Sequence, residues 1–120
     1  MATDNIIDMR AIETLRELSP DDGGEFVREL IGIYLQDTPQ RVAEIEQALT
    51  TQDAAIVMRA AHSIKGSSGN FGANRLAQLA AEIEQQGKLG NLADSPGCCA
   101  RLKADYALVA AALTRISQGA

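Results

Sequence analysis

The chain has 120 residues and a net charge of −5, and 46% of it is apolar although only 3% is aromatic. A chain of this length can bury a core of its own, so we expect one domain over residues 1–120. An acidic chain without basic clusters or interleaved aromatic residues is not expected to bind nucleic acid. The apolar residues are mainly Leu, Ile, Val and Ala, a composition that favours packed helices over sheets.

The compartment is predicted from the cysteines and from the hydropathy of the chain. The two cysteines, Cys98 and Cys99, are adjacent and cannot form an ordinary disulfide with each other. No apolar run is long enough to span a bilayer, and the first residues do not resemble a secretory leader. We therefore expect a cytoplasmic protein in a reducing compartment, with no membrane association.

The first half of the chain predicts a short helix followed by a long one. Apolar residues recur at every third position from a start at Asp4 or Asp8 as far as Ser19-Pro20. After a turn at residues 21–24, helical spacing continues to Leu49, and Pro39 predicts a kink within one long helix. The apolar residues assigned to the long helix are Phe26, Leu30, Ile33, Tyr34, Val42, Ile45 and Leu49.

The second half predicts three more helices. Asp53 is suited to cap the first of them, the second ends near residues 87–90, and the third begins at Ser95-Pro96 and extends to about Ile116. Short connections between amphipathic helices make neighbours antiparallel. The predicted fold is therefore all-α: an up-down four-helix bundle over about residues 22–117, with an extra short N-terminal helix. The buried stripe of the helix after Asp53 is Val57, Ala61, Ile64, Ser68 and Phe71.

The only histidine, His62, is predicted to point away from the core. At about 100° per residue it lies about 140° from Val57, the centre of the buried stripe. Gly66 and Gly69 share this exposed face with Ala55 and Met58. Glycine inside a helix costs roughly 1 kcal/mol relative to alanine, so a face made of small residues indicates that a partner approaches it closely.

The chemistry predicted for this face is the binding of a negatively charged group. Lys65 can bring a cation beside the imidazole, and Gly66 leaves space next to the ring, which suits phosphate. The alternative is an ordinary surface histidine without chemistry. A zinc site would need more ligands than one histidine and two adjacent cysteines on another helix. A cysteine nucleophile is also disfavoured, because Cys99 lies on an apolar stripe. We therefore predict no metal.

The segment from Ala61 to Ser68, continuing through Phe71-Gly72 to Leu76 and Glu84, resembles histidine-containing phosphotransfer domains of two-component phosphorelays. The matching motif residues are His62, Lys65, Gly66 and Gly72. The resemblance implies a four-helix bundle whose His62 is reversibly phosphorylated, normally at Nε2, by exchange with an aspartyl phosphate on a response-regulator receiver domain. It also implies a hybrid sensor histidine kinase as a partner, Mg²⁺ on the receiver, and no cofactor in this chain.

The resemblance assigns further roles around His62. Lys65 would be the cation that stabilises the phosphoryl group, and Gly66 would leave room for it. Glu84 occupies the place of a polar residue that touches the histidine, where it could accept the Nδ1 proton or be an ordinary solvated glutamate. The partner would dock on Ala55, Met58, Arg59 and Gly69. Arg59 and Arg75 could meet acidic residues of the partner or simply keep the surface solvated. We expect a monomer.

Three other kinds of domain are alternatives to a phosphorelay module. A histidine kinase dimerisation domain is disfavoured because Ser63, not an acid, follows His62 and the expected proline is missing. No glycine-rich nucleotide-binding segment occurs, so autokinase activity is not expected. The N-terminal phosphoacceptor domain of a chemotaxis kinase and a helical adaptor without phosphate both remain open. The chain could be a whole protein or one domain of a longer one.

Overall fold

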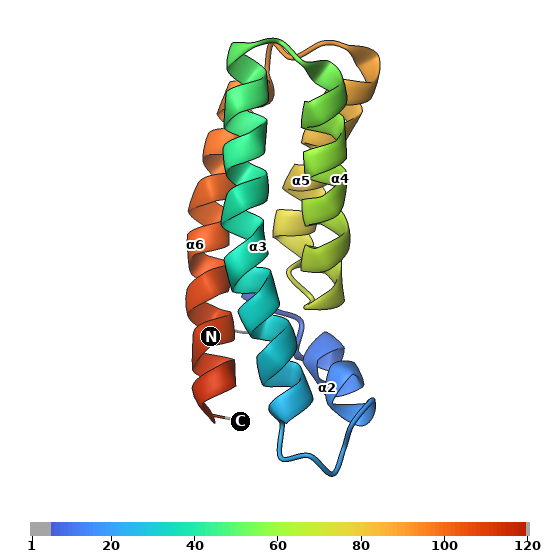
Figure 1. Cartoon of the computed structure of the whole chain (residues 1–120), viewed down its shortest axis with the longest axis vertical. Coiled ribbons are helices and arrows are strands. Elements are labelled where there is room, and N and C mark those ends of the chain that lie inside the picture. Colours follow the sequence, from blue (N-terminus) through green and yellow to red (C-terminus); the bar gives the residue numbers. More distant parts are fainter. Residues whose placement is uncertain (1–5, 120) are drawn as a thin grey trace.

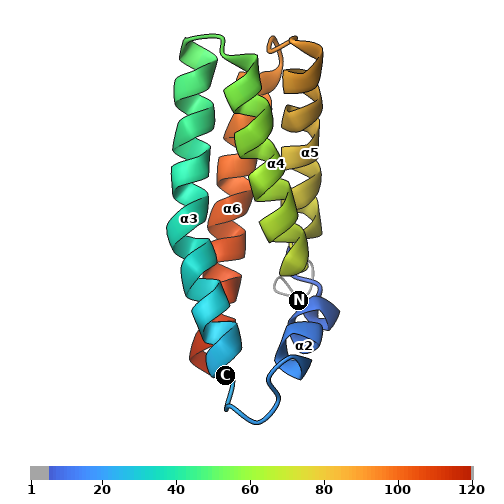
Figure 2. The same cartoon turned by 45° about the vertical axis from the view of Figure 1, so that its right-hand side comes forward.

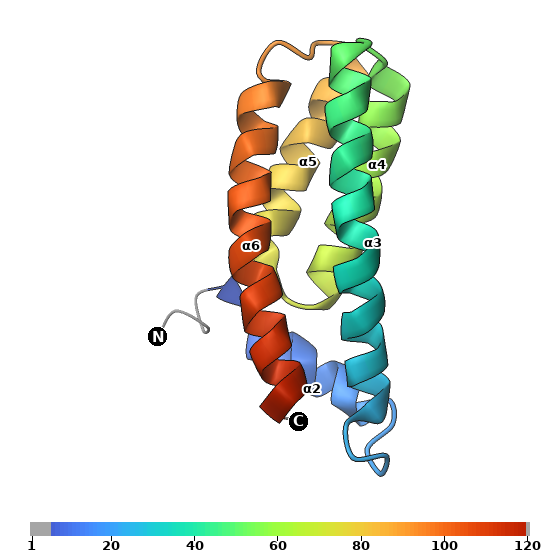
Figure 3. The same cartoon turned by 60° about the vertical axis from the view of Figure 1, so that its left-hand side comes forward.

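The computed structural model describes residues 6–119, which form helices and no strand (Figure 1). The helices α3 to α6 run alternately up and down along the long axis. Each packs against the next, and α6 closes the bundle against α3. The short α2 lies beneath the turn between α4 and α5, at the level of the lower ends of α3 and α6 (Figure 3). The elements are α2 (Met9–Glu17), α3 (Glu25–Thr50), α4 (Ala54–Asn70), α5 (Asn74–Leu89) and α6 (Ser95–Gly119). The predicted all-α bundle with an extra N-terminal helix is therefore confirmed.

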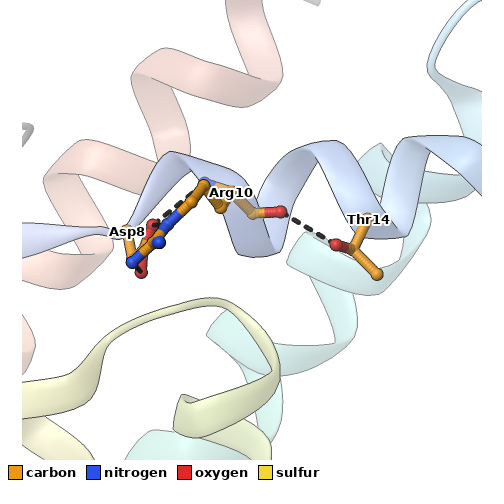
Figure 4. Close-up of polar contacts among 3 residues, drawn as sticks. All are labelled: Asp8, Arg10 and Thr14. Carbon is orange, nitrogen blue, oxygen red and sulfur yellow. Dashed lines mark hydrogen bonds and ion pairs between the residues drawn. The ribbon is translucent and has the colours of Figure 1, made fainter.

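The start of α2 is fixed by Asp8, the second of the two predicted positions; the first, Asp4, lies outside the described residues. The Asp8 carboxylate accepts a 3.0 Å hydrogen bond from the Arg10 backbone N–H. It also forms an ion pair with the Arg10 guanidinium, with an Nη2 to Oδ2 distance of 2.9 Å. The Thr14 hydroxyl in turn donates to the Arg10 carbonyl at 2.9 Å (Figure 4). A capping carboxylate of this kind satisfies backbone donors that a helix leaves free.

The turn between α4 and α5 holds the beginning of α2. Gly72 has φ +73°, and a Cβ at this position would lie 2.5 Å from the Asp8 carbonyl oxygen. The Asp8 N–H also donates to the Gly72 carbonyl at 2.9 Å. Only glycine fits both the backbone conformation and the close approach, so this glycine joins α2 to the bundle.

Pro39 lies inside α3, which continues as a single helix through it, as predicted. Proline has no N–H, so the Leu35 carbonyl has no donor one turn further along the helix. The Tyr106 hydroxyl of α6 donates to this carbonyl at 3.4 Å. A hydrogen bond from a side chain of α6 thus takes the place of the backbone hydrogen bond that Pro39 removes.

The stripe predicted for the first half of α3 is partly wrong. Ile33 is 63% exposed, and Phe26 and Leu30 are only partly buried. The core is filled instead by Val27 and Ile31. Six of the nine residues from Phe26 to Tyr34 are apolar, so their pattern alone does not decide which edge of the broad stripe faces α4 and α6.

Helix α4 follows the sequence prediction closely. The Asp53 carboxylate accepts a 3.2 Å hydrogen bond from the Ile56 N–H. All five residues of the predicted stripe are buried. One of them, Ser68, hydrogen-bonds the buried Tyr34 hydroxyl at 2.7 Å. The side of α4 that faces the core is therefore fully occupied by packing, which leaves the opposite side for chemistry.

Helix α6 extends to Gly119, beyond the predicted limit near residue 117, because its helical hydrogen bonding continues past the last apolar residue of the pattern. Cys98 and Cys99 are both free and buried near its beginning, as expected. None of the helices within residues 6–119 is long and apolar enough to cross a membrane.

Candidate functional site

His62 stands in the middle of α4 on the face opposite the buried stripe, and its side chain is 67% exposed. The surface beside it is open, since a Cβ at Gly66 or Gly69 would meet nothing within 4 Å. Ala55 and Arg59 are also exposed, and Met58 is partly buried. The structure therefore gathers the predicted docking residues on one face around the imidazole.

Glu84 reaches this face from the neighbouring helix α5, which runs beside α4 (Figure 2). Its side chain is only 7% exposed, and its Oε2 lies 2.9 Å from His62 Nδ1. Of the two alternatives that the sequence left open, the structure shows the contact with His62. Glu84 is a buried group with a defined partner and not a solvated glutamate.

Two lysines share the Glu84 carboxylate with His62. Lys65 Nζ lies 2.7 Å from Glu84 Oε1, and Lys88 Nζ lies 3.7 Å from Oε2. The sequence analysis did not find Lys88. Its spacing of four residues after Glu84 on one helix is the signal that could have found it, because such positions are neighbours on a helix surface. A buried carboxylate is thus surrounded by two cations and an imidazole.

The charge state of Glu84 determines which nitrogen of His62 carries the proton. The hydrogen bond from Lys65, helped by the one from His62, lowers the pKa of Glu84 below its ordinary value, and burial opposes this shift. An ionised carboxylate can only accept hydrogen bonds, so Nδ1 must be the donor. The neutral ring then carries its lone pair on Nε2, which no described residue hydrogen-bonds. The arrangement presents a nucleophilic nitrogen to solvent.

Other residues considered from the sequence have partners inside the protein. Arg75 forms an ion pair with the buried Asp105 of α6, with an Nη2 to Oδ1 distance of 2.5 Å. Arg75 is therefore partly exposed but also joins α5 to α6 through this ion pair. The Ser67 hydroxyl donates to the Ser63 carbonyl at 3.0 Å, and Ser68 is bonded to Tyr34, so both serines act within the fold.

Comparison with known families decides what kind of protein carries this site. The model of the Hpt domain family matches residues 29–115, which include most of α3, all of α4 and α5, and most of α6. The chain belongs to the Hpt domain family. The Hpt match contains His62, Lys65, Glu84 and Lys88, and it excludes α2.

Solved and curated proteins agree with this assignment. The crystal structure of histidine-containing phosphotransfer protein B from Pseudomonas aeruginosa PAO1 has a TM-score of 0.87 and 28% identity, over 96% of both chains. This chain is also 26% identical, over 84 residues that make up 70% of its length, to multistep phosphorelay regulator 1 of Schizosaccharomyces pombe. It is 34% identical over 64 residues, 53% of this chain, to the sensor protein TorS of Escherichia coli K12.

The matched segments are small parts of the longer curated relatives. The alignment covers 28% of the Schizosaccharomyces pombe regulator and 7% of TorS. The Pseudomonas aeruginosa protein, in contrast, matches this chain over nearly the whole length of both. The comparison therefore establishes the domain family and its fold.

Proposed function

We propose that this Hpt domain is a phosphorelay intermediate in which His62 accepts a phosphoryl group from an aspartyl phosphate of a receiver domain and passes it to another. The observation that carries the proposal is the geometry of His62, whose Nδ1 is bonded to a buried carboxylate while 67% of the side chain is exposed. The names of the relatives, a phosphorelay regulator and a histidine-containing phosphotransfer protein, support the same function.

The transfer step uses the lone pair of Nε2. A bond forms between Nε2 and phosphorus while the bond from phosphorus to the aspartyl oxygen breaks, and the aspartate leaves as a carboxylate. No proton has to move, because Nδ1 keeps its hydrogen throughout. Positive charge develops on the ring as the lone pair is donated, and the Glu84 carboxylate at 2.9 Å stabilises that charge. The reverse step follows the same path.

Lys65 is proposed to stabilise the phosphoryl oxygens, and Gly66 to leave the space they need. Lys65 is paired with Glu84 in the unphosphorylated protein, so its ammonium must move towards the phosphoryl group. This movement does not leave a buried carboxylate without partners, because His62 and Lys88 stay beside Glu84. Lys65 can therefore contact the phosphoryl group while Glu84 stays paired with His62 and Lys88.

The proposed partners are response-regulator receiver domains, which supply the Mg²⁺, and a hybrid sensor histidine kinase. They would dock on the exposed surface of Ala55, Met58, Arg59 and Gly69, where small side chains allow close approach. The similarity to a segment of the sensor protein TorS supports this class of partner. We propose that the domain works as a monomer without autokinase activity, and that it holds no cofactor.

The test is phosphoryl transfer from a panel of phosphorylated receiver domains of the source organism. At least one receiver should label the wild-type protein with a phosphate that is labile in acid and stable in alkali. The His62→Gln variant should take no label while keeping its helical circular dichroism and its affinity for the receiver. Label that persists in the variant would place the phosphate on another residue and contradict the proposal. No label from any receiver would also contradict it, and would favour an adaptor that binds without phosphate.

A further inference from the structure

Helices α4 and α5 approach each other closely at Gly87. A Cβ built on this buried glycine would lie 2.9 Å from Met58 Cβ, 2.9 Å from the Met58 backbone nitrogen and 3.0 Å from the Ala54 carbonyl oxygen. Carbon atoms in contact prefer separations of about 3.5–4.0 Å. Every one of these neighbours is a backbone or Cβ atom, so no change of side-chain rotamer can make room. Gly87 therefore allows a helix separation that other residues would prevent.

Glu84 and Gly87 are three residues apart and lie on the same side of α5, which faces α4. Both are buried, and the two residues that Gly87 approaches, Met58 and Ala54, lie about one and two turns of α4 before His62. From this side Glu84 bridges to α4, with its two oxygens 2.9 Å from His62 Nδ1 and 2.7 Å from Lys65 Nζ. Those distances depend on how closely the two helices pack at this level.

We propose that Gly87 is a positioning residue for His62, because the close helix approach that it permits holds the Glu84 carboxylate within hydrogen-bond distance of Nδ1. The expected effect on the transfer rate rests on the proposed phosphotransfer function, whereas the expected effect on the His62 tautomer does not. Gly87 touches neither the imidazole nor the phosphoryl group, and it acts only through Glu84.

An added methyl group shows how the effect arises. To restore normal contact distances at Gly87, α5 would have to move away from α4 by about 0.5 Å or more. The same movement would take a 2.9 Å hydrogen bond at Glu84 to about 3.4 Å or beyond, where such bonds are weak. Without this acceptor, Nδ1 no longer retains the proton preferentially, and both tautomers of His62 become populated.

The experiment compares Gly87→Ala with Gly32→Ala, a matched control in α3 where a Cβ would meet nothing within 4 Å. Alanine favours helix over glycine at both positions, but only at Gly87 does the added methyl group meet other atoms too closely, so a change in thermal stability is expected there and is not used as the readout. The first readout is the ¹⁵N spectrum of the imidazole, which is unambiguous because the chain has one histidine. Wild type and Gly32→Ala should show protonated Nδ1 and unprotonated Nε2, and Gly87→Ala should show a mixture.

The second readout is the rate of phosphoryl transfer in a double-mutant cycle with Glu84→Ala. Gly87→Ala should slow transfer about fivefold to tenfold in the wild-type background and leave the rate unchanged when Glu84 is already absent. A merely structural role would give the same slowing in both backgrounds. That result, or an unchanged tautomer in Gly87→Ala, would overturn the proposal.

Two controls keep the outcomes separate. The Met58→Gly/Gly87→Ala protein lacks one of the contacts and should recover part of the wild-type ¹⁵N pattern; it also carries the test if Gly87→Ala does not fold. No recovery would count against the proposal. The ¹⁵N measurement needs no phosphate. If the wild-type protein takes no label but Gly87→Ala still changes the His62 tautomer, the proposed function is wrong and the role of Gly87 stands.

Discussion

Two buried carboxylates join α5 to its neighbours, and they differ in what they hold. Glu84 of α5 is 7% exposed and contacts His62, Lys65 and Lys88, and Asp105 of α6 is 6% exposed and contacts Arg75 of α5. The first carboxylate orients an exposed imidazole beside open glycine surface. The second ties one helix to another, and its Oδ2 is buried without a hydrogen-bond partner among the described residues.

The comparison shows that burial of a carboxylate does not by itself mark a functional site. Both groups are desolvated and both face a cation, so the acid alone does not distinguish them. What separates them is the group at the other end of the contact, which is an exposed imidazole, the proposed nucleophile, in one case and an arginine that joins two helices in the other. Variants of the two clusters should therefore affect different measurements.

The largest effect is expected from Glu84→Ala. Losing the carboxylate frees the His62 tautomer and removes the charge that stabilises the phosphorylated ring, so transfer should slow about tenfold to a hundredfold. Rapid-quench transfer from a phosphorylated receiver measures the rate. Asp105→Ala is the matched control, and its rate should equal that of the wild type. Equal slowing in both variants would remove the distinction between the clusters.

Arg75→Ala should have the opposite profile. It leaves the Asp105 carboxylate buried without its partner, which should destabilise the fold by about 1–3 kcal/mol and leave the transfer rate unchanged. Urea denaturation measures the free energy of unfolding. The Arg75→Ala/Asp105→Leu protein should recover most of the loss, because an apolar pair can replace a buried ion pair. An unchanged free energy of unfolding in Arg75→Ala would show that the ion pair with Arg75 does not stabilise the buried Asp105 carboxylate.

Lys65→Ala should slow transfer severalfold without comparable destabilisation. Its side chain is 39% exposed, and Glu84 keeps His62 and Lys88 as partners, so the free energy of unfolding should fall by less than about 1 kcal/mol. Lys88→Ala is the control on the same carboxylate, and its rate should lie closer to that of the wild type. If Lys65→Ala unfolds more readily than Arg75→Ala, Lys65 is structural.

The smallest effect is a pH dependence of stability. Because the pKa of Glu84 is lowered in the folded protein, its ionised form stabilises the fold at neutral pH, and this contribution is lost as the pH falls through the ordinary value of 4.5 and below. The difference in Tm between wild type and Glu84→Gln should therefore shrink from neutral pH to about pH 3. A difference that stays constant over this range would contradict the assigned charge state.

The helices could be predicted from the sequence because caps, apolar periodicity and proline positions depend on residues close together in the chain. The Asp53 cap, the period of the α4 stripe and Pro96 at the start of α6 each depend on residues within one or two turns. The exposed position of His62 followed from the same periodicity. The misassigned Ile33 shows where this fails, since a broad apolar face can turn either edge towards the core.

The site itself could be predicted only in part. The contact of Glu84 with His62 depends on the register between α4 and α5, which periodicity within one helix does not determine, so the sequence left two alternatives. The partner of Arg75 lies thirty residues away on α6. The close packing at Gly87 is likewise a property of two helices, and the glycine alone looked like the end of α5.

We propose above all that Glu84 holds the proton on Nδ1 of His62, so that Nε2 receives the phosphoryl group. The most direct test is to phosphorylate ¹⁵N-histidine-labelled protein with its receiver and to identify the phosphorylated nitrogen by its coupling to ³¹P. We expect one species, with phosphorus on Nε2 of His62 and hydrogen on Nδ1. Phosphorus on Nδ1, or on any residue other than His62, would contradict it.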